Sequence, residues 1–217
     1  MKEITLCLTS CNRWSLLEKT IDSFLRLNKY PIKEYLLHED SNNEEMFSKI
    51  QHKYGHLFKI LRPENNVGLL KSIDNLYELV NTPYIFHLED DWEFKGNSNF
   101  MKESLDILEN NSNIHQIWTR KGIPNDWLEP KNSNNYRMVK QSHYGDWTGF
   151  SFNPGLRRLN DYKLMFPNGY SEYHDITKNS ALNEHDCNLV TIKYNYRAAI
   201  LNNSACIHIG ENQSTYK

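Results

Sequence analysis

The chain has 217 residues, with 39% hydrophobic, 12% aromatic and 24% charged side chains, and its formal net charge at pH 7 is -2. This near-balance of charge argues against a general nucleic-acid binder and a polybasic membrane binder, because both carry an excess of lysine and arginine. The length and apolar content suit one sizeable domain with a buried core.

Cysteine usage and the N-terminal residues indicate a cellular location. The four cysteines form no CxxC pair and no dense framework, which is typical of reduced thiols in an intracellular protein. The opening residues, MKEITLCLTSCNRW, are interrupted by polar side chains too early for a secretory signal. No apolar run approaches the roughly 20 residues of a membrane span. We therefore expect a cytoplasmic protein without a membrane span.

The first strand and helix are predicted near the N-terminus. Residues 4–8 form a short β-rich run that ends in small polar side chains. Ser15 and Glu18 have the spacing of a capping box, which predicts that a helix starts there. The apolar residues that follow have helical spacing: Leu17, Ile21, Phe24 and Leu25.

The same order of strand, polar loop and helix recurs twice. The strand in EYLLHEDSNNEE leads into an acidic loop and a helix expected over residues 44–54. A strand near residues 58–61 leads into a loop with proline and glycine, and the next helix carries its apolar residues between 69 and 80.

Residues 84–88 supply a fourth strand. Strands that alternate with helices imply a mainly parallel sheet with helices on both faces, and ligands of such sheets gather at the carboxyl ends of the strands. The four strand ends are all polar and read TSCNR, HEDSN, RPENN and LEDDW. We expect them to form one rim that carries the functional site.

The fourth strand end places three carboxylates side by side, Glu89, Asp90 and Asp91, after a segment that reads as buried. Two like charges about 4 Å apart repel by about 4 kcal/mol at an effective dielectric constant of about 20. We therefore expect a positive group beside these carboxylates in the working protein.

The second half of the chain is less regular. A helix is expected over residues 100–109 and a strand over 114–119, followed by a loop-like stretch from 121 to 147. A helix around residues 183–194 and a short strand at 197–201 precede a polar tail. There is no internal repeat and no low-complexity linker, which favours a single domain.

Six ordered pieces of the sequence resemble glycosyltransferases of the GT-A fold, close in style to the large inverting family 2. The pieces are ITLCLTSCNRWSLLEKTIDSFL, LLHEDSNN, ENNVGLLKSIDNL, LEDDW, NEHDCNLV and CIHIG. The similarity runs from Ile4 to about Gly210 and is thin between Lys121 and Trp147. The order and spacing of the pieces are more specific than any one of them.

The resemblance implies an α/β protein with a single GT-A domain over residues 1–217. Its Rossmann-like half, residues 1–98, is expected to bind the nucleotide sugar and to end at the acidic motif. The irregular half, residues 99–217, is expected to carry the acceptor site and the catalytic base. The implied reaction is metal-dependent, inverting transfer of a hexose from a UDP-sugar, or a dTDP- or GDP-sugar, to a hydroxyl group of a glycan, glycoprotein or glycoside.

Ten residues along the predicted rim are implied to bind the nucleotide sugar. Hydroxyl, amide, guanidinium and backbone N–H groups suit contacts to a base and to phosphates. The residues are Thr9, Ser10, Asn12, Arg13, Asp40, Asn66, Gly68, Lys71, Glu89 and Asp90. Lys71 could equally be a solvated lysine in a first helical turn, and Ser15 is expected to serve its helix instead.

The acidic segment falls where the family has its DxD metal motif, with a glutamate at the first position. A divalent ion that bridges two phosphates stabilises a departing diphosphate, and Mn²⁺ and Mg²⁺ accept carboxylate oxygens as ligands. Asp91 is the implied direct ligand, and His208 in CIHIG is an added one. The alternatives are a solvated acidic turn and a histidine that makes only structural hydrogen bonds.

The segment NEHDCNLV resembles the one that supplies the catalytic base. Aligning its leucine makes Asp186 the base, and Glu184 competes because the segment reads EHD rather than adjacent E and D. A carboxylate near a helix N-terminus can also simply be stabilised by the helix dipole. Trp147 and Asp146 are expected to line the sugar or acceptor site. Packing is the more typical role of the other aromatic residues considered: Trp92, Trp118, Trp127 and Tyr144.

Three other functions use similar residues. A nucleotidyltransferase also holds Mg²⁺ with carboxylates, although it usually has a glycine-rich phosphate loop, and TSCNRW contains no glycine. An inert sugar- or nucleotide-binding module would keep the fold without the chemistry, and a glycoside hydrolase would use two carboxylates without a nucleotide. The sequence leaves the donor sugar, the acceptor, the linkage and the oligomeric state open.

Overall fold

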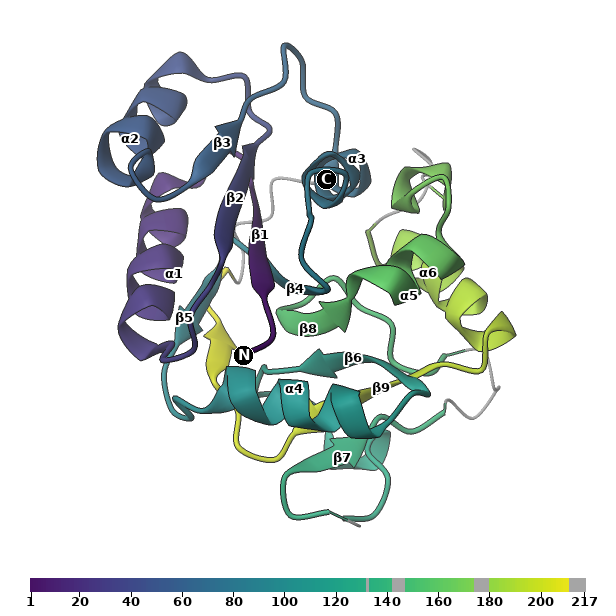
Figure 1. Cartoon of the computed structure of the whole chain (residues 1–217). Helices are drawn as coiled ribbons and strands as arrows, with labels where there is room; N and C mark the ends of the chain where they lie inside the picture. Colours follow the sequence, from purple (N-terminus) through teal and green to yellow (C-terminus); the bar gives the residue numbers. More distant parts are fainter. Residues whose placement is uncertain (132, 142–146, 174–179, 211–217) are drawn as a thin grey trace.

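The structure is a computed structural model of the chain, and it describes residues 1–131, 133–141, 147–173 and 180–210. Strands and helices alternate through the first half, as the sequence predicts, and the second half adds further strands to the same sheet (Figure 1).

The N-terminal half contributes four parallel strands, which lie in the order β3-β2-β1-β4. Their bounds are β1 (Ile4–Ser10), β2 (Glu34–Glu39), β3 (Lys59–Leu61) and β4 (Tyr84–Glu89). All residues of β1 are buried, which is typical of a parallel strand covered on both faces. The four expected strands are confirmed, and β1 extends two residues further than expected.

Beyond β4 the sheet becomes mixed, so the expectation of a mainly parallel sheet holds for the first half only. β8 (Gly155–Arg158) pairs antiparallel with β4 and with β6 (Ile114–Trp118). β9 (Arg197–Leu201) lies parallel to β6, and β7 (Tyr136–Met138) pairs antiparallel with β9. Because β8 is antiparallel to both β4 and β6, those two strands run in the same direction. The carboxyl end of β6 therefore lies on the same side of the sheet as the predicted rim.

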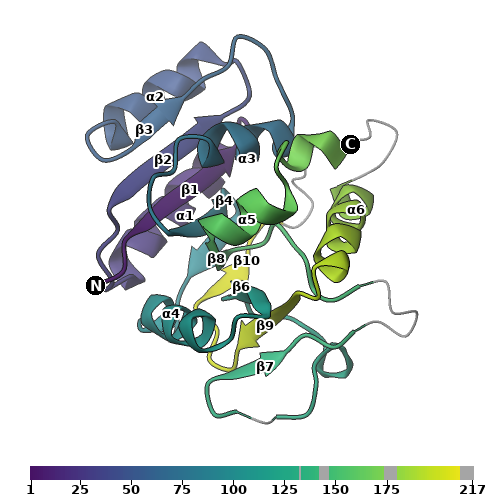
Figure 2. The same cartoon turned by 45° about the vertical axis from the view of Figure 1, so that its right-hand side comes forward.

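Helices cover both faces of the sheet, and each face has its own core (Figures 1 and 2). The helices and 3-10 turns are α1 (Trp14–Leu27), α2 (Glu44–Tyr54), α3 (Leu69–Tyr77), α4 (Phe100–Asn110), η1 (Asn125–Trp127), α5 (Leu159–Met165), η2 (Tyr170–Tyr173) and α6 (Ser180–Lys193). Successive residues of a strand point to opposite faces, so Leu6 belongs to the same core as Ile21 of α1, whereas Cys7 belongs to the other core, with Ile73 of α3. No helix of the described residues is both long enough and apolar enough to cross a membrane.

Helix α1 starts two residues earlier than the capping box predicts, because the N-cap is Arg13 rather than Ser15. It begins at Trp14, and the carbonyl group of Arg13 accepts the N–H groups of Leu16 and Leu17 at 3.1 and 2.9 Å. Arg13 occupies the N-cap position and makes no side-chain capping bond there, and Ser15 is exposed within the first turn. The predicted capping box is therefore wrong, and the Arg13 side chain is directed to a different partner.

A separate two-stranded sheet brings the end of the chain beside the acidic motif. β5 (Trp92–Phe94) pairs antiparallel with β10 (Cys206–His208), so His208 lies opposite Trp92. The N–H group of Ile209 donates to the carbonyl oxygen of Asp91 at 2.8 Å and continues this pairing. Two segments more than a hundred residues apart thus share one edge of the rim.

Candidate active site

The loops after β1 and β4 meet at the carboxyl edge of the sheet. The parallel register pairs Thr9 with Glu89, at the ends of the two strands. The hydroxyl group of Ser10 donates to Oδ2 of Asp90 at 3.0 Å, and both side chains are buried. The predicted rim therefore exists at this point, with TSCNR directly against LEDDW.

The positive group beside the acidic motif is Arg13. Its Nε donates to Oδ2 of Asp90 at 3.1 Å, its Nη1 donates to Oδ2 of Asp91 at 2.9 Å, and its Nη2 pairs with Oδ1 of Asp90. Burial opposes the charge of Arg13, but Asp90 and then Asp91 outweigh burial and raise its pKa. Burial raises the pKa of Asp90 to about 6, and the Arg13 charge limits that rise. Arg13 was expected to bind the nucleotide sugar, and here it neutralises the predicted metal motif.

Asp91 and His208 form a two-residue donor set. Nε2 of His208 lies 3.2 Å from Oδ2 of Asp91, and the His208 side chain is 40% exposed. A Cβ atom on Gly210 would lie 2.4 Å from that same oxygen, so only glycine lets the chain pass this close. A carboxylate and an imidazole suit Mn²⁺. The described residues hold no group of three or more potential ligands, so this set fits an ion whose other ligands are substrate oxygens and water.

Glu89 lies among carboxylates. Its Oε2 accepts a hydrogen bond from Nε1 of Trp92 at 3.3 Å. Burial raises the pKa of Glu89 well above its usual range, and the charges of Asp91 and Glu184 raise it further. A cation bound at this rim would therefore be favoured electrostatically by several side chains at once.

Glu184, on α6, belongs to the same electrostatic environment. Its Oε1 accepts the N–H group of Phe152 at 2.8 Å and the hydroxyl group of Ser151 at 3.2 Å. Burial raises the pKa of Glu184, and these two hydrogen bonds oppose the rise. The charge that Glu184 exerts on Glu89 links α6 to the end of β4.

Arg120 was not predicted as a site residue. It follows the carboxyl end of β6, and its guanidinium group lies 5.5 Å from the ring centre of Trp92 and 5.9 Å from that of Trp118. Burial lowers the pKa of Arg120, and the charges of Glu184 and Glu89 oppose the decrease. The sequence carried a usable signal, because the strand expected at 114–119 ends directly before this arginine.

A cavity of about 470 Å³ opens beside the acidic motif. Its lining includes Trp92, Arg120, Lys121, Asn153, Ile207 and His208. A second, much smaller cavity of about 20 Å³ lies between the first and fourth strand ends and is lined by residues such as Ser10, Arg13 and Asp90. The acidic motif thus lies between a tight polar slot on the β1 side and an open cavity on the β6 side.

The family of the chain follows from its sequence. Residues 5–179 match the family described as "Glycosyl transferase family 2". The chain belongs to glycosyl transferase family 2. No curated protein matches it significantly in sequence.

Solved structures with the same fold are GT-A glycosyltransferases. S. aureus TarS 1-349 aligns with a TM-score of 0.68 at 12% identity, over 97% of this chain and 61% of TarS 1-349. The mannosyltransferase PcManGT from Pyrobaculum calidifontis, in complex with GDP-Man and Mn²⁺, aligns with a TM-score of 0.68 at 10% identity, over 97% of this chain and 58% of PcManGT. TarS 1-349 in complex with UDP-GlcNAc aligns with a TM-score of 0.65 at 14% identity, over 99% of this chain and 62% of TarS 1-349. This chain therefore spans about three fifths of the length of these structures.

In this family 2 domain, Asp40 builds the loop that precedes α3. Its two carboxylate oxygens accept the N–H groups of Val67 and Gly68, each at 2.8 Å, and Nδ2 of Asn66 donates to its carbonyl oxygen at 2.9 Å. Gly68 has a φ of +82°, a conformation that favours glycine. Lys71 is exposed in the first turn of α3. The structure therefore brings Asp40, Asn66 and Gly68 together, as one bonded loop.

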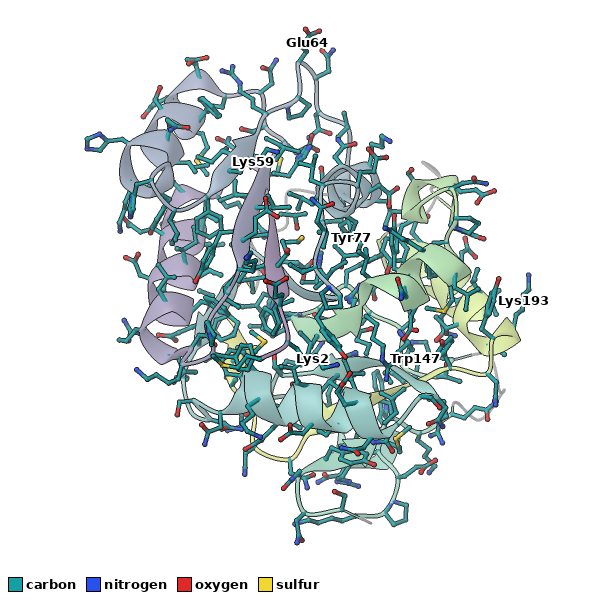
Figure 3. The ribbon with its side chains drawn as sticks, viewed as in Figure 1. Lys2, Lys59, Glu64, Tyr77, Trp147 and Lys193 are labelled. Carbon is teal, nitrogen blue, oxygen red and sulfur yellow. The ribbon has the colours of Figure 1, made fainter. Side chains whose placement is uncertain are left out.

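Trp147, predicted to line the sugar or acceptor site, packs among other tryptophans. Trp147 packs 5.9 Å from the ring centre of Trp118 and 5.5 Å from that of Trp127. Figure 3 places Trp147 on the β9 side of the molecule, far from Lys59 at the other end of the sheet. Asp146 and Tyr144 lie outside the described residues.

Asp186 and Glu184 lie on the same helix but on different faces. Residues two positions apart in a helix do not face the same direction. Asp186 is half-buried, two residues beyond Glu184. The helix face from which Glu184 bonds Ser151 and Phe152 is therefore not the face that carries Asp186. Asn12, which has a φ of +56°, is exposed at the rim, and its N–H group donates to Oε1 of Glu39 at 2.9 Å.

Proposed function

We propose that this family 2 chain transfers a hexose from a nucleotide diphosphate sugar to a hydroxyl group of a glycan or glycoside, with inversion at the anomeric carbon. The observation that carries the proposal is the cluster of Arg13, Asp90, Asp91 and His208 at the carboxyl ends of β1 and β4. A UDP-sugar is the first candidate donor, with dTDP- and GDP-sugars as alternatives. Structures of the same fold in complex with UDP-GlcNAc and with GDP-Man and Mn²⁺ support this donor class.

The nucleotide is proposed to lie over the ends of β1 and β2. Hydroxyl and amide groups there would contact the base, ribose and phosphates, and the Asp40 loop would shape their binding surface. The residues proposed for the nucleotide sugar are Thr9, Ser10, Asn12, Arg13, Asp40, Asn66, Gly68, Lys71, Glu89 and Asp90. Asp91 and His208 would hold Mn²⁺ or Mg²⁺, which supplies charge stabilisation for the leaving diphosphate.

A carboxylate of α6 is proposed to take the proton of the acceptor hydroxyl group. The family resemblance assigns this role to Asp186. The alternative, Glu184, is favoured by its burial, its raised pKa and the charge that it exerts on Glu89. Either residue must come within hydrogen-bond distance of the attacking oxygen, on the side of the sugar opposite the diphosphate. Trp147 and Asp146 remain proposals for the sugar or acceptor site.

Calorimetric titration with UDP, dTDP and GDP, each with Mn²⁺ and with EDTA, tests the donor part of the proposal. We expect one nucleotide to bind only with the metal, and we expect Asp91→Ala to abolish that binding. Asp106→Ala is the matched control, because Asp106 is an exposed aspartate on α4 that pairs only with Lys102 among the described residues. If none of the nucleotides shows metal-dependent binding to the wild type, the proposed function is wrong.

The stereochemistry is tested on the product once a donor is known. An inverting enzyme releases a product whose new glycosidic bond has the opposite anomeric configuration to the donor, and ¹H NMR coupling constants report that configuration. Retention would leave the fold assignment intact but would remove the role proposed for the α6 carboxylate.

A further inference from the structure

The cavity of about 470 Å³ beside the acidic motif has a one-sided charge. Two cations, Arg120 and Lys121, line it, and no carboxylate is among its described lining residues. Ile207 contributes an apolar wall, and Asn153 contributes an amide. The cavity is therefore suited to a ligand that combines an uncharged, polar body with negative charge.

Arg120 is a cation without a close partner. Among the described residues its guanidinium group makes no hydrogen bond and no ion pair within 4.0 Å, and its buried Nε has no hydrogen-bond partner. Two tryptophan rings fix its position instead. An arginine presents five N–H donors, and most buried polar groups in proteins are hydrogen-bonded, so a partly buried and unpaired guanidinium group is prepared for an anionic ligand.

The cavity lies between the proposed metal site and the α6 carboxylate that is the candidate catalytic base. On one side its lining residue His208 contacts Asp91 at 3.2 Å. On the other side Asn153 donates its backbone N–H to Oγ of Ser151 at 3.2 Å, and that hydroxyl group in turn donates to Glu184. The proposed nucleotide surface is elsewhere, over β1 and β2. A ligand in the cavity would thus lie between the leaving group and the α6 carboxylate, where the acceptor is needed.

We propose that this cavity binds the acceptor and that the acceptor carries an oxyanion, a phosphate or a carboxylate, which Arg120 and Lys121 recognise. This inference rests on the proposed function, since it names the class of acceptor for the same transfer. Arg120 supplies a directional, partly desolvated contact, and Lys121 supplies an exposed charge. Arg120 and Lys121 are therefore specificity-determining residues for a charged acceptor.

Binding of three probes to the protein tests the proposal. Glucose 1-phosphate, methyl glucuronide and methyl glucoside represent a sugar phosphate, a sugar carboxylate and a neutral sugar, and each is titrated in the presence of Mn²⁺ and the nucleotide that binds. We expect at least one anionic probe to bind at least about tenfold more tightly than the neutral one. An affinity difference of this size is what one or two charge-assisted hydrogen bonds provide. Comparing the affinities of glucose 1-phosphate and methyl glucuronide shows whether the cavity prefers a phosphate or a carboxylate.

Two variants assign the effect to the cavity. Lys121→Ala and Arg120→Gln should each weaken the anionic probe about tenfold and leave the Kd of the nucleotide unchanged. Lys121 is exposed, so its replacement tests the proposal even if the Arg120 variant folds poorly. Lys29→Ala is the matched control, because Lys29 is an exposed lysine just beyond the carboxyl end of α1.

Three results overturn the proposal. The first is that the wild type binds none of the three probes or binds all of them equally. The second is that both variants bind the anionic probe as tightly as the wild type does. The third is that the variants bind the nucleotide more weakly, which would assign the two cations to the donor. All three are distinguishable from failure of the proposed function, which would appear as a wild type that binds no nucleotide in a metal-dependent way.

Discussion

At the scale of single residues, one arginine decides the electrostatics of the acidic motif. Arg13 binds Asp90 and Asp91 at once, and Asp90 is completely buried. A divalent ion held by His208 and by Oδ2 of Asp91, the oxygen nearest His208, would have to share Oδ2 with the guanidinium group or displace it. The metal and Arg13 are therefore competitors for one oxygen, and a nucleotide diphosphate is the ligand that could accept both.

Arg13→Ala should increase the affinity for Mn²⁺ in the absence of nucleotide. Removing the competing cation leaves two carboxylates without their partner, and we expect the Kd for Mn²⁺ to decrease about tenfold, or about 1.4 kcal/mol. Electron paramagnetic resonance of free Mn²⁺ measures this directly. Arg13→Lys keeps the charge and Arg26→Ala removes an exposed arginine of α1, so both should bind Mn²⁺ as the wild type does. Unchanged or weaker Mn²⁺ binding by Arg13→Ala would contradict the competition.

The two carboxylates of α6 are separable by their amide variants. Asp186→Asn and Glu184→Gln keep size and remove the ability to accept a proton. The variant at the true base should lose about 10²–10⁴-fold in kcat with unchanged nucleotide Kd, which is the usual contribution of a general base. Single-turnover transfer from the donor measures this difference. If both variants retain kcat within a factor of a few, neither residue is the base.

At the scale of elements, a buried aspartate ties α3 to the second half of the chain. Oδ1 of Asp74 accepts the hydroxyl group of Tyr162 at 2.9 Å and the N–H group of Tyr170 at 2.8 Å, and Oδ2 accepts the N–H group of Ser171 at 2.8 Å. A Cβ atom on Gly169, where φ is +87°, would lie 2.5 Å from this carboxylate. The helix beside the proposed nucleotide surface is thus held by a tyrosine hydroxyl group of α5 and two backbone N–H groups of the η2 turn.

Asp74→Ala should destabilise the fold strongly. The substitution leaves two backbone N–H groups and one hydroxyl group without their acceptor, and we expect a loss of about 3 kcal/mol in the free energy of unfolding. Urea denaturation followed by circular dichroism measures it. Asp106→Ala, which removes an exposed aspartate, is the control and should change stability by less than about 0.5 kcal/mol. A comparably small effect of Asp74→Ala would show that the three hydrogen bonds carry little stability.

The elements of the first half were predictable because their signals are local. Apolar runs, helical spacing and polar strand ends place the first four strands and the rim within a few neighbouring residues. The pairing of β5 with β10 has no local signal, since three residues of each strand meet across a separation of more than a hundred positions. The role of Arg13 was missed for a similar reason. The sequence indicated that the carboxylates need a cation, but it could not distinguish a metal from an arginine that the turn before α1 directs toward them.

At the scale of the whole molecule, two sets of buried groups respond to acid in opposite ways. The pKa of His38 is lowered to about 4 and that of His115 to about 3, chiefly by burial, and burial also holds the pKa of His87 well below its usual range. Two carboxyl groups of the rim are shifted upward, also chiefly by burial: the pKa of Asp90 is raised to about 6, and that of Glu89 lies well above its usual range. Stability as a function of pH is therefore a balance between the core histidines and the rim.

The histidine side of this balance is measurable at His38. Its folded pKa lies below the unfolded value of about 6.5, so between about pH 6.5 and pH 4 the unfolded chain binds a proton that the folded chain does not. Its contribution is fully present above pH 6.5 and decreases as pH falls toward 4, by up to about 3 kcal/mol.

His38→Gln removes that titration and keeps a polar side chain next to Nδ2 of Asn75, which lies 3.2 Å from Nε2 of His38. Upward-shifted carboxylates such as Asp90 change stability in the opposite direction, and they do so equally in both proteins. The difference between variant and wild type therefore isolates His38. We expect the variant to lose less stability than the wild type between pH 7 and pH 4.5 in urea denaturation, while His52→Gln, which changes an exposed histidine of α2, should follow the wild-type curve. Parallel curves for His38→Gln and the wild type would mean that His38 is protonated in the folded protein, which its full burial against α3 opposes.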